Sequence, residues 1–313
     1  MKVFVQIPCL NEEKTLHLVI ESIPKKIKNV DEVHILIIDD GSSDKTIEIA
    51  QKLGVTHFVK HTSNMGLARS FRDGVDYALK HGADIIVNTD GDNQYPQSRI
   101  ADLVQPIISG DADIVIGDRQ TAKIAHFSPF KKRMQRFGSW IVNKAAGTDL
   151  PDAASGFRAY SRGSLLKLNI VTQFSYCMET IIQAGNKRLK ITSIEIETNK
   201  KTRESRLFKN IWHHMFKSGQ AITRSFIMFK PYVIFSTLGF TFLIIGAIPF
   251  VSFGINWLSG NSRGHLQSLI FGSSMLVGSL LSFALLVISD LLRTNRILIE
   301  DQLEHIKEIQ YKK

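Results

Sequence analysis

The sequence is poor in cysteine, with only Cys9 and Cys177 among its 313 residues. Two thiols cannot form a disulfide framework for a chain of this length, which excludes the class of small secreted proteins that disulfides stabilise. Cys9 lies in a turn, residues 8–12, where a small side chain suffices and thiol chemistry is not required. We therefore expect both thiols to be reduced and to have no catalytic role.

The amino terminus lacks a long hydrophobic run. Its first apolar stretch is only about seven residues, begins directly after Lys2, and is not followed by a small-residue cleavage site, so it does not have the form of a secretory signal. The chain also lacks internal repeats and low-complexity tracts. We expect the amino-terminal part to be a folded domain that stays in the cytoplasm.

Short β-rich runs alternate with helical patterns over residues 1–200. Strands are predicted at 2–7, 33–38, 56–60, 84–88, 113–117 and 191–198. Helices, with apolar residues three and four positions apart, are predicted at 13–23, 44–53, 67–81 and 97–108. Strands that alternate with helices predict an α/β fold, in which helices cover both faces of a mostly parallel sheet. No flexible linker interrupts this region, so we expect one domain.

Polar clusters follow three of the predicted strands, at residues 8–12, 39–44 and 90–94, and each precedes a predicted helix. In open α/β sheets, ligands bind outside the carboxyl ends of the strands. The three clusters are therefore expected to meet in one crevice. A single cluster could be no more than an acidic turn that caps the next helix, but three in succession favour a binding site.

The third cluster contains two carboxylates, Asp90 and Asp92, and the amide of Gln94. Hard oxygen ligands that leave coordination positions open suit Mg²⁺ or Mn²⁺, which bind through one or two carboxylates together with substrate phosphates. We predict a metal site here that also holds a diphosphate.

Residues 64–69, Asn-Met-Gly-Leu-Ala-Arg, lie between the second and third clusters, and this order of motifs resembles the family 2 glycosyltransferases of the GT-A fold. The resemblance covers roughly residues 2–207 and implies a Rossmann-like, mixed but mostly parallel sheet that binds a nucleotide sugar. It also implies which residues surround the nucleotide, with Asp39 accepting from the uracil or guanine ring and Asp40 near the ribose. The implied set is Pro8, Leu10, Asn11, Glu12, Asp39, Asp40, Asn64, Gly66 and Asp90.

A basic segment follows the predicted strand 113–117. No acidic residue occurs from Arg119 to Lys144, although a solvated helix face normally mixes charges of both signs. Charge of one sign near a metal site indicates an anionic substrate in addition to the nucleotide. Arg119 and Arg136 are the candidates, because a guanidinium group donates two parallel hydrogen bonds to a phosphate.

Three short motifs extend the resemblance to dolichyl- and polyprenyl-phosphate sugar synthases. They are Gly-Asp-Arg at 117–119, Arg-Phe-Gly-Ser at 136–139 and Ser-Gly-Phe-Arg at 155–158, and residues 202–206 are similar to a Gly-x-Ser-Lys lid, with no glycine and with arginine in place of lysine. The resemblance implies that these segments surround the phosphate of a lipid acceptor. The residues it assigns to that phosphate are Arg119, Arg136, Ser139, Arg158, Ser205 and Arg206.

The resemblance also implies a mechanism. The metal, held by Asp92 with Asp90 and Gln94, would bind the donor diphosphate while a lipid phosphate oxygen attacks the anomeric carbon from the opposite face, with inversion. A phosphate monoester is already charged near neutral pH, so this reaction needs no strong general base. A sugar hydroxyl acceptor would need one. Glu179 is the candidate base for that alternative, although it could equally be a structural residue at a helix start.

Two long uncharged runs, 232–258 and 266–289, each exceed the roughly 20 residues that span a bilayer. The alternative, two buried core helices, would require a large partner surface around each. Basic residues are frequent after the second run and rare between the two runs, which predicts that both termini are cytoplasmic. The sequence therefore predicts a multi-pass protein of the inner or plasma membrane, with two spans and a cytoplasmic catalytic domain.

Between the domain and the first span, residues 200–230 contain eight Lys or Arg and one acidic residue, Glu204, interleaved with aromatic residues. This pattern predicts an interfacial amphipathic helix on the lipid bilayer. Nucleic acid is the rival explanation of the net charge of +10, but no nucleic-acid motif accompanies the charge, and we expect no nucleic-acid partner. The predicted organisation is a domain at 1–206, an interfacial helix at 207–230, an anchor at 231–292 and a carboxyl-terminal helix at 293–313.

Three functions are consistent with these features. The first is a membrane-bound synthase that transfers one sugar from a UDP- or GDP-linked donor to polyprenyl phosphate, undecaprenyl or dolichyl. The second is a family 2 transferase that acts on a glycan or lipid-linked saccharide hydroxyl. The third is a membrane scaffold that binds nucleotides without turnover, which the intact acidic clusters disfavour. The apolar residues of 296–310 predict packing either on a second copy, as a homo-oligomer, or on the chain's own domain.

Overall fold

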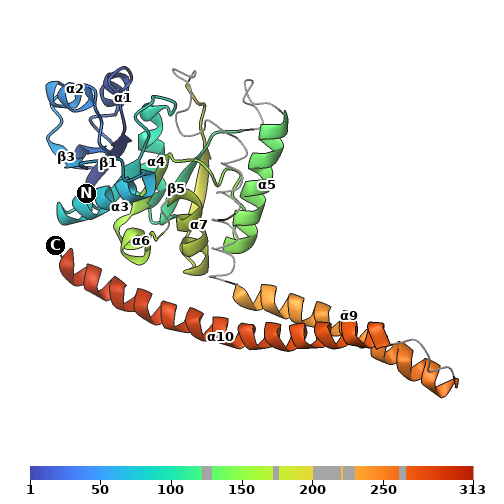
Figure 1. Ribbon diagram of the computed structural model, residues 1–313. Helices are drawn as coiled ribbons and strands as arrows, with labels where there is room; N and C mark the ends of the chain where they lie inside the picture. Colours follow the sequence, from blue (N-terminus) through green and yellow to red (C-terminus); the bar gives the residue numbers. More distant parts are fainter. Residues whose placement is uncertain (122–128, 172–175, 200–219, 221–229, 261–265, 313) are drawn as a thin grey trace. The chain divides into compact units, whose positions relative to one another are not determined.

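The computed structural model describes the chain except for residues 122–128, 172–175, 200–219, 221–229, 261–265 and 313 (Figure 1). The described residues form two contact units. The first comprises Met1–Ile222 together with Asp301–Lys313, and the second comprises Thr223–Glu300. The predicted interfacial helix at 207–230 lies outside the described residues, apart from Gln220 and Lys230.

A seven-stranded mixed sheet forms the centre of the first unit, in the order β3-β2-β1-β4-β6-β5-β7. Its strands are β1 (Lys2–Cys9), β2 (Glu32–Asp39), β3 (His57–Lys60), β4 (Ile85–Asn88), β5 (Ile114–Asp118), β6 (Arg158–Ser161) and β7 (Ile191–Glu195). All pairings are parallel except those of β6, which runs antiparallel to β4 and β5. The prediction of a mixed, mostly parallel α/β sheet is confirmed. The sequence did not predict β6, which has only four residues.

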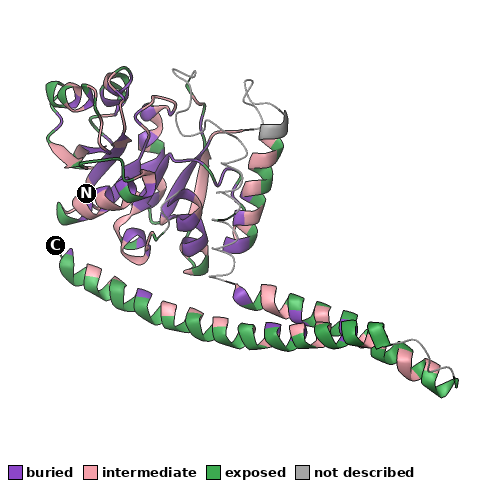
Figure 2. Ribbon diagram, in the orientation of Figure 1, coloured by how far each residue is buried: buried purple, intermediate pink, exposed green. Residues whose placement is uncertain are grey.

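Helices cover both faces of this sheet. They are α1 (Leu16–Ser22), α2 (Thr46–Lys52), α3 (Leu67–Lys80), the short 3₁₀ helix η1 (Gln97–Arg99), α4 (Ile100–Ile108), α5 (Pro129–Ala146), α6 (Arg162–Lys167) and α7 (Tyr176–Asn186). Alternate residues of β1 point to opposite faces. Val3, Val5 and Ile7 join the core beneath α1 and α4, whereas Phe4 packs on the His34 ring of β2. Figure 2 shows the strands buried between the helices.

Strand order determines where a ligand can bind. The order reverses between β1 and β4, since β2 and β3 lie on one side of β1 and the remaining strands on the other. Strands β1, β2, β4 and β5 all run in the same direction, so their carboxyl ends meet at one edge of the sheet. A crevice at such a reversal is the usual ligand site of an open α/β sheet.

The second unit contains α9 (Pro231–Leu258) and most of α10 (Leu266–Gln310). Both helices are long and apolar enough to cross a membrane, and they contain the predicted spans. Only 11% of the most apolar window of each is buried, which argues against two core helices. The helices pack through small residues, as membrane helices commonly do, and Ser279 Oγ donates to the Gly239 carbonyl oxygen across 2.8 Å. The predicted separate helix at 293–313 is the distal part of α10, which continues without a break to Gln310.

The last residues of the chain belong to the first unit. Tyr311 is 5% exposed, and its hydroxyl group donates to Asp76 Oδ1 on α3 across 3.0 Å. Lys307 Nζ donates across 2.8 Å to both the Leu168 carbonyl oxygen and Asn169 Oδ1. Of the two packings predicted for residues 296–310, contact with the chain's own domain is therefore present in these final turns. Homo-oligomerisation stays a prediction.

Candidate active site

The first two polar clusters interlock at the carboxyl ends of β1 and β2. Asn11 has φ = 56°, and its amide N–H donates to Ser42 Oγ across 2.9 Å. In return, Asn11 Oδ1 accepts from the Ser43 amide across 2.8 Å. The Glu12 amide donates to Thr46 Oγ1 across 2.8 Å. These bonds fix the two loops as one wall, as the strand-end argument predicts. Pro8 and Leu10 are half-buried in the same wall.

Asp39 is the last residue of β2 and Asp40 follows it, and each is 6% exposed. Asp39 Oδ1 accepts from the Ser42 amide across 3.2 Å. Asp40 instead holds the turn of residues 64–66, because its two oxygens accept from the amides of Met65 (2.8 Å) and Gly66 (3.0 Å). The ring Nδ1 of His61 lies 2.7 Å from Asp40 Oδ1. The structure thus gives Asp40 a positioning role, and its predicted place near the ribose stays a prediction.

The loop after β2 approaches the 61–66 turn so closely that it needs glycine. Gly41 has φ = +82°, a conformation that L side chains rarely adopt, and a Cβ there would lie 2.8 Å from the Ser63 carbonyl carbon. Asn64 lies exposed on the same turn. Glycine at position 41 therefore allows Asp40 to reach the amides of residues 65 and 66.

The acidic turn follows β4, with Asp90, Asp92 and Gln94 half-buried. Gln94 donates to both Asp92 oxygens, from its backbone amide across 3.2 Å and from Nε2 across 2.8 Å. A Cβ on Gly91 would lie 3.1 Å from Glu12 Cγ, so glycine allows this turn to pack on the first polar cluster. All three predicted clusters therefore meet at one edge of the sheet.

The acidic turn fits a divalent cation shared with a substrate. Within the described residues, no three His, Cys, Asp or Glu side chains gather into a closed metal cage. Asp90 and Asp92 could supply hard carboxylate oxygens, and a diphosphate would complete the shell, which is the usual arrangement of Mg²⁺. In this geometry the side-chain nitrogen of Gln94 faces Asp92. Gln94 therefore orients the carboxylate, and its role as a ligand stays a prediction.

The Ser-Gly-Phe-Arg turn lies against the acidic turn. The Gly156 amide donates to Tyr95 Oη across 3.0 Å, and the Gly156 carbonyl oxygen accepts from Asn88 Nδ2 across 3.0 Å. The Tyr176 hydroxyl lies 3.2 Å from the same carbonyl oxygen. A Cβ on Gly156 would lie 3.5 Å from Asp90 Oδ2, so the two turns are in contact. Burial raises the pKa of Tyr95 well above its ordinary value, which keeps this phenol neutral.

Arg119 follows β5 and pairs with Asp152. Arg119 Nε lies 2.7 Å from Asp152 Oδ2, and Nη2 lies 3.0 Å from Oδ1. The side chains are 18% and 2% exposed. Burial opposes the charge of Arg119, but nearby Tyr95 and Asp152 outweigh burial and raise the pKa of the guanidinium group. Burial would likewise raise the pKa of Asp152, but Arg119 and backbone amides lower it. Both groups are therefore charged.

The remaining predicted acceptor residues are placed differently from one another. Arg136 is exposed on α5. Ser139 is 8% exposed, and its Oγ accepts from the Ala153 amide across 3.2 Å. Arg158 is completely buried, and its guanidinium group donates to the carbonyl oxygens of Ser155, Cys177 and Ala153. A side chain held in this way cannot reach a phosphate in the crevice, so we remove Arg158 from the acceptor set and assign it a structural role.

Ser205 and Arg206, predicted in the lid, lie outside the described residues. Asn199, the last described residue before that segment, is attached to the acidic turn. Its amide donates to the Gln94 carbonyl oxygen across 2.9 Å. Its Nδ2 donates to the Asn93 carbonyl oxygen across 3.0 Å. These two bonds join the chain that follows β7 to the predicted metal turn.

Glu179, the alternative general base, lies in α7 and is 1% exposed. Both of its carboxylate oxygens lie 3.2 Å from the Val171 amide, and Gln183 Nε2 lies 3.3 Å from Oε1. A group buried in this way does not face the crevice between the polar clusters. The structure therefore supports the structural reading of Glu179 over the catalytic one.

Several residues of the site were not predicted from the sequence. Asp152 holds Arg119, and Tyr95 and Asn88 hold Gly156. The one available signal was the position of Asp152, three residues before the Ser-Gly-Phe-Arg turn. The two cysteines are free and buried, as expected for thiols without a catalytic role, and burial raises the pKa of Cys9, with Glu12 adding to the effect.

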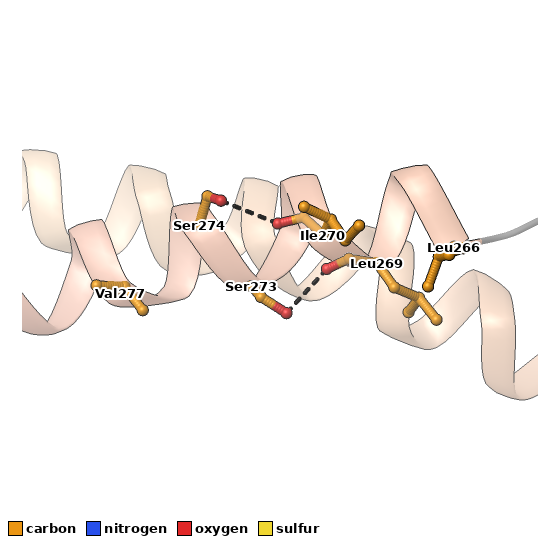
Figure 3. A pocket seen from close by; sticks show the side chains of 6 residues that line it. All are labelled: Leu266, Leu269, Ile270, Ser273, Ser274 and Val277. Atoms are coloured by element: carbon orange, nitrogen blue, oxygen red, sulfur yellow. Dashed lines mark hydrogen bonds between the residues drawn. The ribbon is translucent and has the colours of Figure 1, made fainter.

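A hollow on the surface of α10 is not a second candidate for the active site. It is lined by Leu266, Leu269, Ile270, Ser273, Ser274 and Val277 (Figure 3). Its two hydroxyl groups donate to carbonyl oxygens of their own helix, Ser273 to Leu269 and Ser274 to Ile270. A hollow on one apolar helix, with no charged side chain in its lining, offers nothing to bind a phosphate or a metal.

Comparison with protein families gives a match between residues 4–168 and the model described as Glycosyl transferase family 2. Among curated proteins, the UDP-N-acetylglucosamine–dolichyl-phosphate N-acetylglucosaminyltransferase of Methanococcus voltae is 30% identical over 217 residues, which are 63% of this chain and 85% of that protein. The polyprenol monophosphomannose synthase of Mycolicibacterium smegmatis is 27% identical over 187 residues, which are 57% of this chain and 69% of that protein.

Among solved structures, the chain is similar to glucosyl-3-phosphoglycerate synthase from Mycobacterium tuberculosis in complex with Mn²⁺, UDP-glucose and phosphoglyceric acid. The TM-score is 0.56 at 18% identity, and the match covers 72% of this chain and 78% of that one. A complex of the same enzyme with Mg²⁺ and UDP gives a TM-score of 0.54 at 17% identity, with the same coverage. At this level of identity the likeness shows a shared fold.

Proposed function

Because the chain belongs to glycosyl transferase family 2, and is therefore a glycosyltransferase, we propose that it transfers a single sugar from a UDP- or GDP-linked donor to a polyprenyl phosphate. The reaction is a direct displacement with inversion at the anomeric carbon. The names of two relatives, a dolichyl-phosphate transferase and a polyprenol monophosphomannose synthase, support this class of acceptor.

One observation carries the proposal. The acidic turn of Asp90 and Asp92 and the basic side chain of Arg119 both adjoin residues 152–157, with Asp90 beside Gly156 and Arg119 paired to Asp152. The donor diphosphate needs carboxylates that hold a cation, and the acceptor phosphate needs a guanidinium group. Their proximity provides both within one crevice.

Each residue has a part in this proposal. Asp90 and Asp92, with Gln94, would hold Mg²⁺ or Mn²⁺ together with the donor diphosphate, and a bound cation would stabilise the charge that develops on the leaving nucleoside diphosphate. Asp39 accepts a hydrogen bond from the base, beside the wall formed by Pro8, Leu10, Asn11 and Glu12. Asp40 fixes the turn of Asn64 and Gly66 near the donor.

On the acceptor side, the residues proposed to bind the lipid phosphate are Arg119, Arg136, Ser139, Ser205 and Arg206. The phosphate oxygen attacks without a general base, because a phosphate monoester is largely ionised at neutral pH. The burial of Glu179 supports this acceptor, since a hydroxyl acceptor would require an accessible base.

The two candidate membrane helices support a location at the bilayer, where polyprenyl phosphates are found. We propose that α9 and α10 anchor the chain in the inner or plasma membrane. The catalytic domain and both termini then face the cytoplasm, where nucleotide sugars are available.

The test is transfer from a panel of radiolabelled UDP- and GDP-sugars to undecaprenyl phosphate by the full chain in detergent, with Mn²⁺ or with EDTA. We expect a chloroform-extractable product that EDTA and Asp92→Asn both abolish. Asp102→Asn, the same change at an exposed position of α4, is the matched control and should leave transfer intact. Labelling of only an added glycan would refute the lipid phosphate acceptor, and full activity of Asp92→Asn would refute the metal site.

A further inference from the structure

His61 has a buried side chain that takes no part in the proposed reaction. It directly follows β3, and its amide donates to the Asp39 carbonyl oxygen across 2.9 Å, so the backbone places it beside the end of β2. The side chain is only 6% exposed. A polar ring that is taken out of water in this way needs hydrogen-bond partners. Those partners indicate what the residue does.

The imidazole ring of His61 bridges two carboxylates. Nδ1 lies 2.7 Å from Asp40 Oδ1, and Nε2 lies 3.2 Å from Asp73 Oδ2 on α3. An ionised carboxylate only accepts hydrogen bonds, so each ring nitrogen donates to its partner. Arg69 holds Asp73 from one turn earlier on α3, with Nε 2.6 Å from the same carboxylate oxygen. One bond therefore fixes the orientation of the ring, and the other reaches Asp40.

Asp40 transmits this constraint to the turn of residues 64–66. Its Oδ1 accepts from both the His61 ring and the Met65 amide, and its Oδ2 accepts from the Gly66 amide. The terminal torsion of an aspartate is soft, so a further N–H group from a rigid, buried ring defines the plane of the carboxylate. That plane in turn determines where the two amides of the turn lie.

We propose that His61 is a positioning residue for the nucleotide half of the site. It holds Asp40, and through Asp40 the turn of residues 64–66, in the conformation that binds the nucleoside diphosphate of the sugar donor. This inference rests on the proposed function, because it takes a nucleotide as a ligand of the crevice. The residues proposed for the acceptor phosphate follow β5 and do not contact His61, so the effect should be confined to the nucleotide.

Two substitutions separate the bond to Asp40 from simple packing. The side-chain nitrogen of asparagine can take the place of Nδ1, and that of glutamine can take the place of Nε2. His61→Asn therefore keeps the bond to Asp40, whereas His61→Gln keeps only the bond to Asp73. A residue that merely fills space would give the opposite order, because glutamine is closer to histidine in volume. His305→Gln, at a side chain that is 78% exposed on α10, is the matched control.

The experiment titrates the full chain in detergent with UDP and with GDP, each in the presence of Mn²⁺, by isothermal titration calorimetry. Transfer assays to undecaprenyl phosphate give separate KM values for the nucleotide sugar and for the lipid. We expect His61→Gln to weaken nucleotide binding and to raise KM for the nucleotide sugar about tenfold, since a hydrogen bond to a charged group is lost. His61→Asn should stay within about twofold of the wild type, and KM for the lipid should not change in either variant.

Asp73→Asn gives a second test of the same contacts at a more exposed side chain, 20% exposed. It removes the charge that orients the ring but leaves the bond to Asp40, so we expect a smaller weakening of nucleotide binding, about threefold. If near-UV circular dichroism shows that His61→Gln does not fold, this variant decides, and unchanged nucleotide affinity would overturn the proposal.

Equal weakening by the two His61 variants, or a larger effect of His61→Asn, would overturn the proposal, because packing would then explain the residue. An equal rise of KM for the nucleotide sugar and for the lipid would also overturn it. A wild type that binds neither nucleotide would refute the proposed function together with this inference. Normal binding by the wild type that both His61 variants leave unchanged would refute the role of His61 alone.

Discussion

The ion pair between Arg119 and Asp152 makes the sharpest test of the acceptor side of the site. Asp152→Asn keeps the shape of the side chain and removes its charge. In the wild type the carboxylate lies 2.7 Å from Arg119 Nε and 3.0 Å from Nη2, and the two side chains are 18% and 2% exposed. The substitution therefore leaves a largely buried cation without its counter-ion.

Removing one partner of a buried pair costs about 3–5 kcal/mol. Water reaches part of the Arg119 side chain, so we expect the lower end, about 3 kcal/mol. For a domain of roughly 200 residues, 1 kcal/mol shifts the midpoint of thermal unfolding by about 2–4 °C. Asp152→Asn should therefore lower Tm by about 6–12 °C.

Near-UV circular dichroism of the full chain in detergent would follow the unfolding transition. Asp149→Asn, the same change at an exposed position three residues earlier, is the matched control and should leave Tm within about 2 °C of the wild type. Arg119→Met combined with Asp152→Asn should recover part of the loss, because no unpaired charge remains in the double variant. A change below about 2 °C for Asp152→Asn would refute the reasoning, since Arg119 would then be compensated by other groups.

The same pair predicts how stability depends on pH. Burial alone would raise the pKa of Asp152, but Arg119 lowers it below the ordinary value of about 3.9. A carboxylate whose pKa is lower in the folded state stabilises the fold above its unfolded pKa, and that stabilisation is lost as the pH falls through its folded pKa. The Tm difference between the wild type and Asp152→Asn should therefore be constant near neutral pH and should shrink below about pH 4.

Two further predictions concern stability. A Cβ on Gly185 of α7 would clash with the Ala146 carbonyl oxygen of α5, so Gly185→Ala must separate the two helices and should destabilise the fold by about 2–3 kcal/mol. The control is Gly163→Ala, which has open space around it and should not destabilise the fold. Thermal unfolding would compare the two variants, and equal midpoints would contradict the packing. Burial and the Asp76 carboxylate raise the pKa of Tyr311 to about 12, so stability should be lost between about pH 10 and 12. Tyr311→Phe should flatten that loss in alkaline unfolding curves, and an unchanged slope would contradict the buried contact.

Local patterns were sufficient to predict most of the sheet. Each long strand is an apolar run that ends in polar residues, and the helices between strands show the expected spacing of apolar residues. Strand β6 escaped prediction because Arg158–Ser161 is short and pairs antiparallel with strands far away in the sequence. Its first residue is a buried arginine, which a sequence pattern assigns to the surface. The meeting of the three polar clusters was predictable, because it follows from strand direction alone.

The distinction between a residue that faces a ligand and one that holds a loop was not predictable. Asp39 and Asp40 are adjacent and equally buried, yet Asp40 binds the amides of the 64–66 turn. Arg119 and Arg158 also differ in role. Arg119 is paired with a carboxylate at the edge of the sheet, whereas Arg158 is enclosed by backbone carbonyl groups. In each pair the amino-acid type is identical, and only the positions of distant backbone groups determine the role.

A crevice that receives two phosphate-bearing substrates needs both residues that face a ligand and residues that hold those side chains in place. Carboxylates and guanidinium groups that lie close together would pair with one another if their side chains could turn freely. Gln94 holds Asp92, Asp152 holds Arg119, and neutral groups of Tyr95 and Asn88 fix the acidic turn to the Ser-Gly-Phe-Arg turn by binding Gly156. Fixed neighbours thus keep the acidic and basic sides of the crevice apart, so that each remains directed at its own substrate.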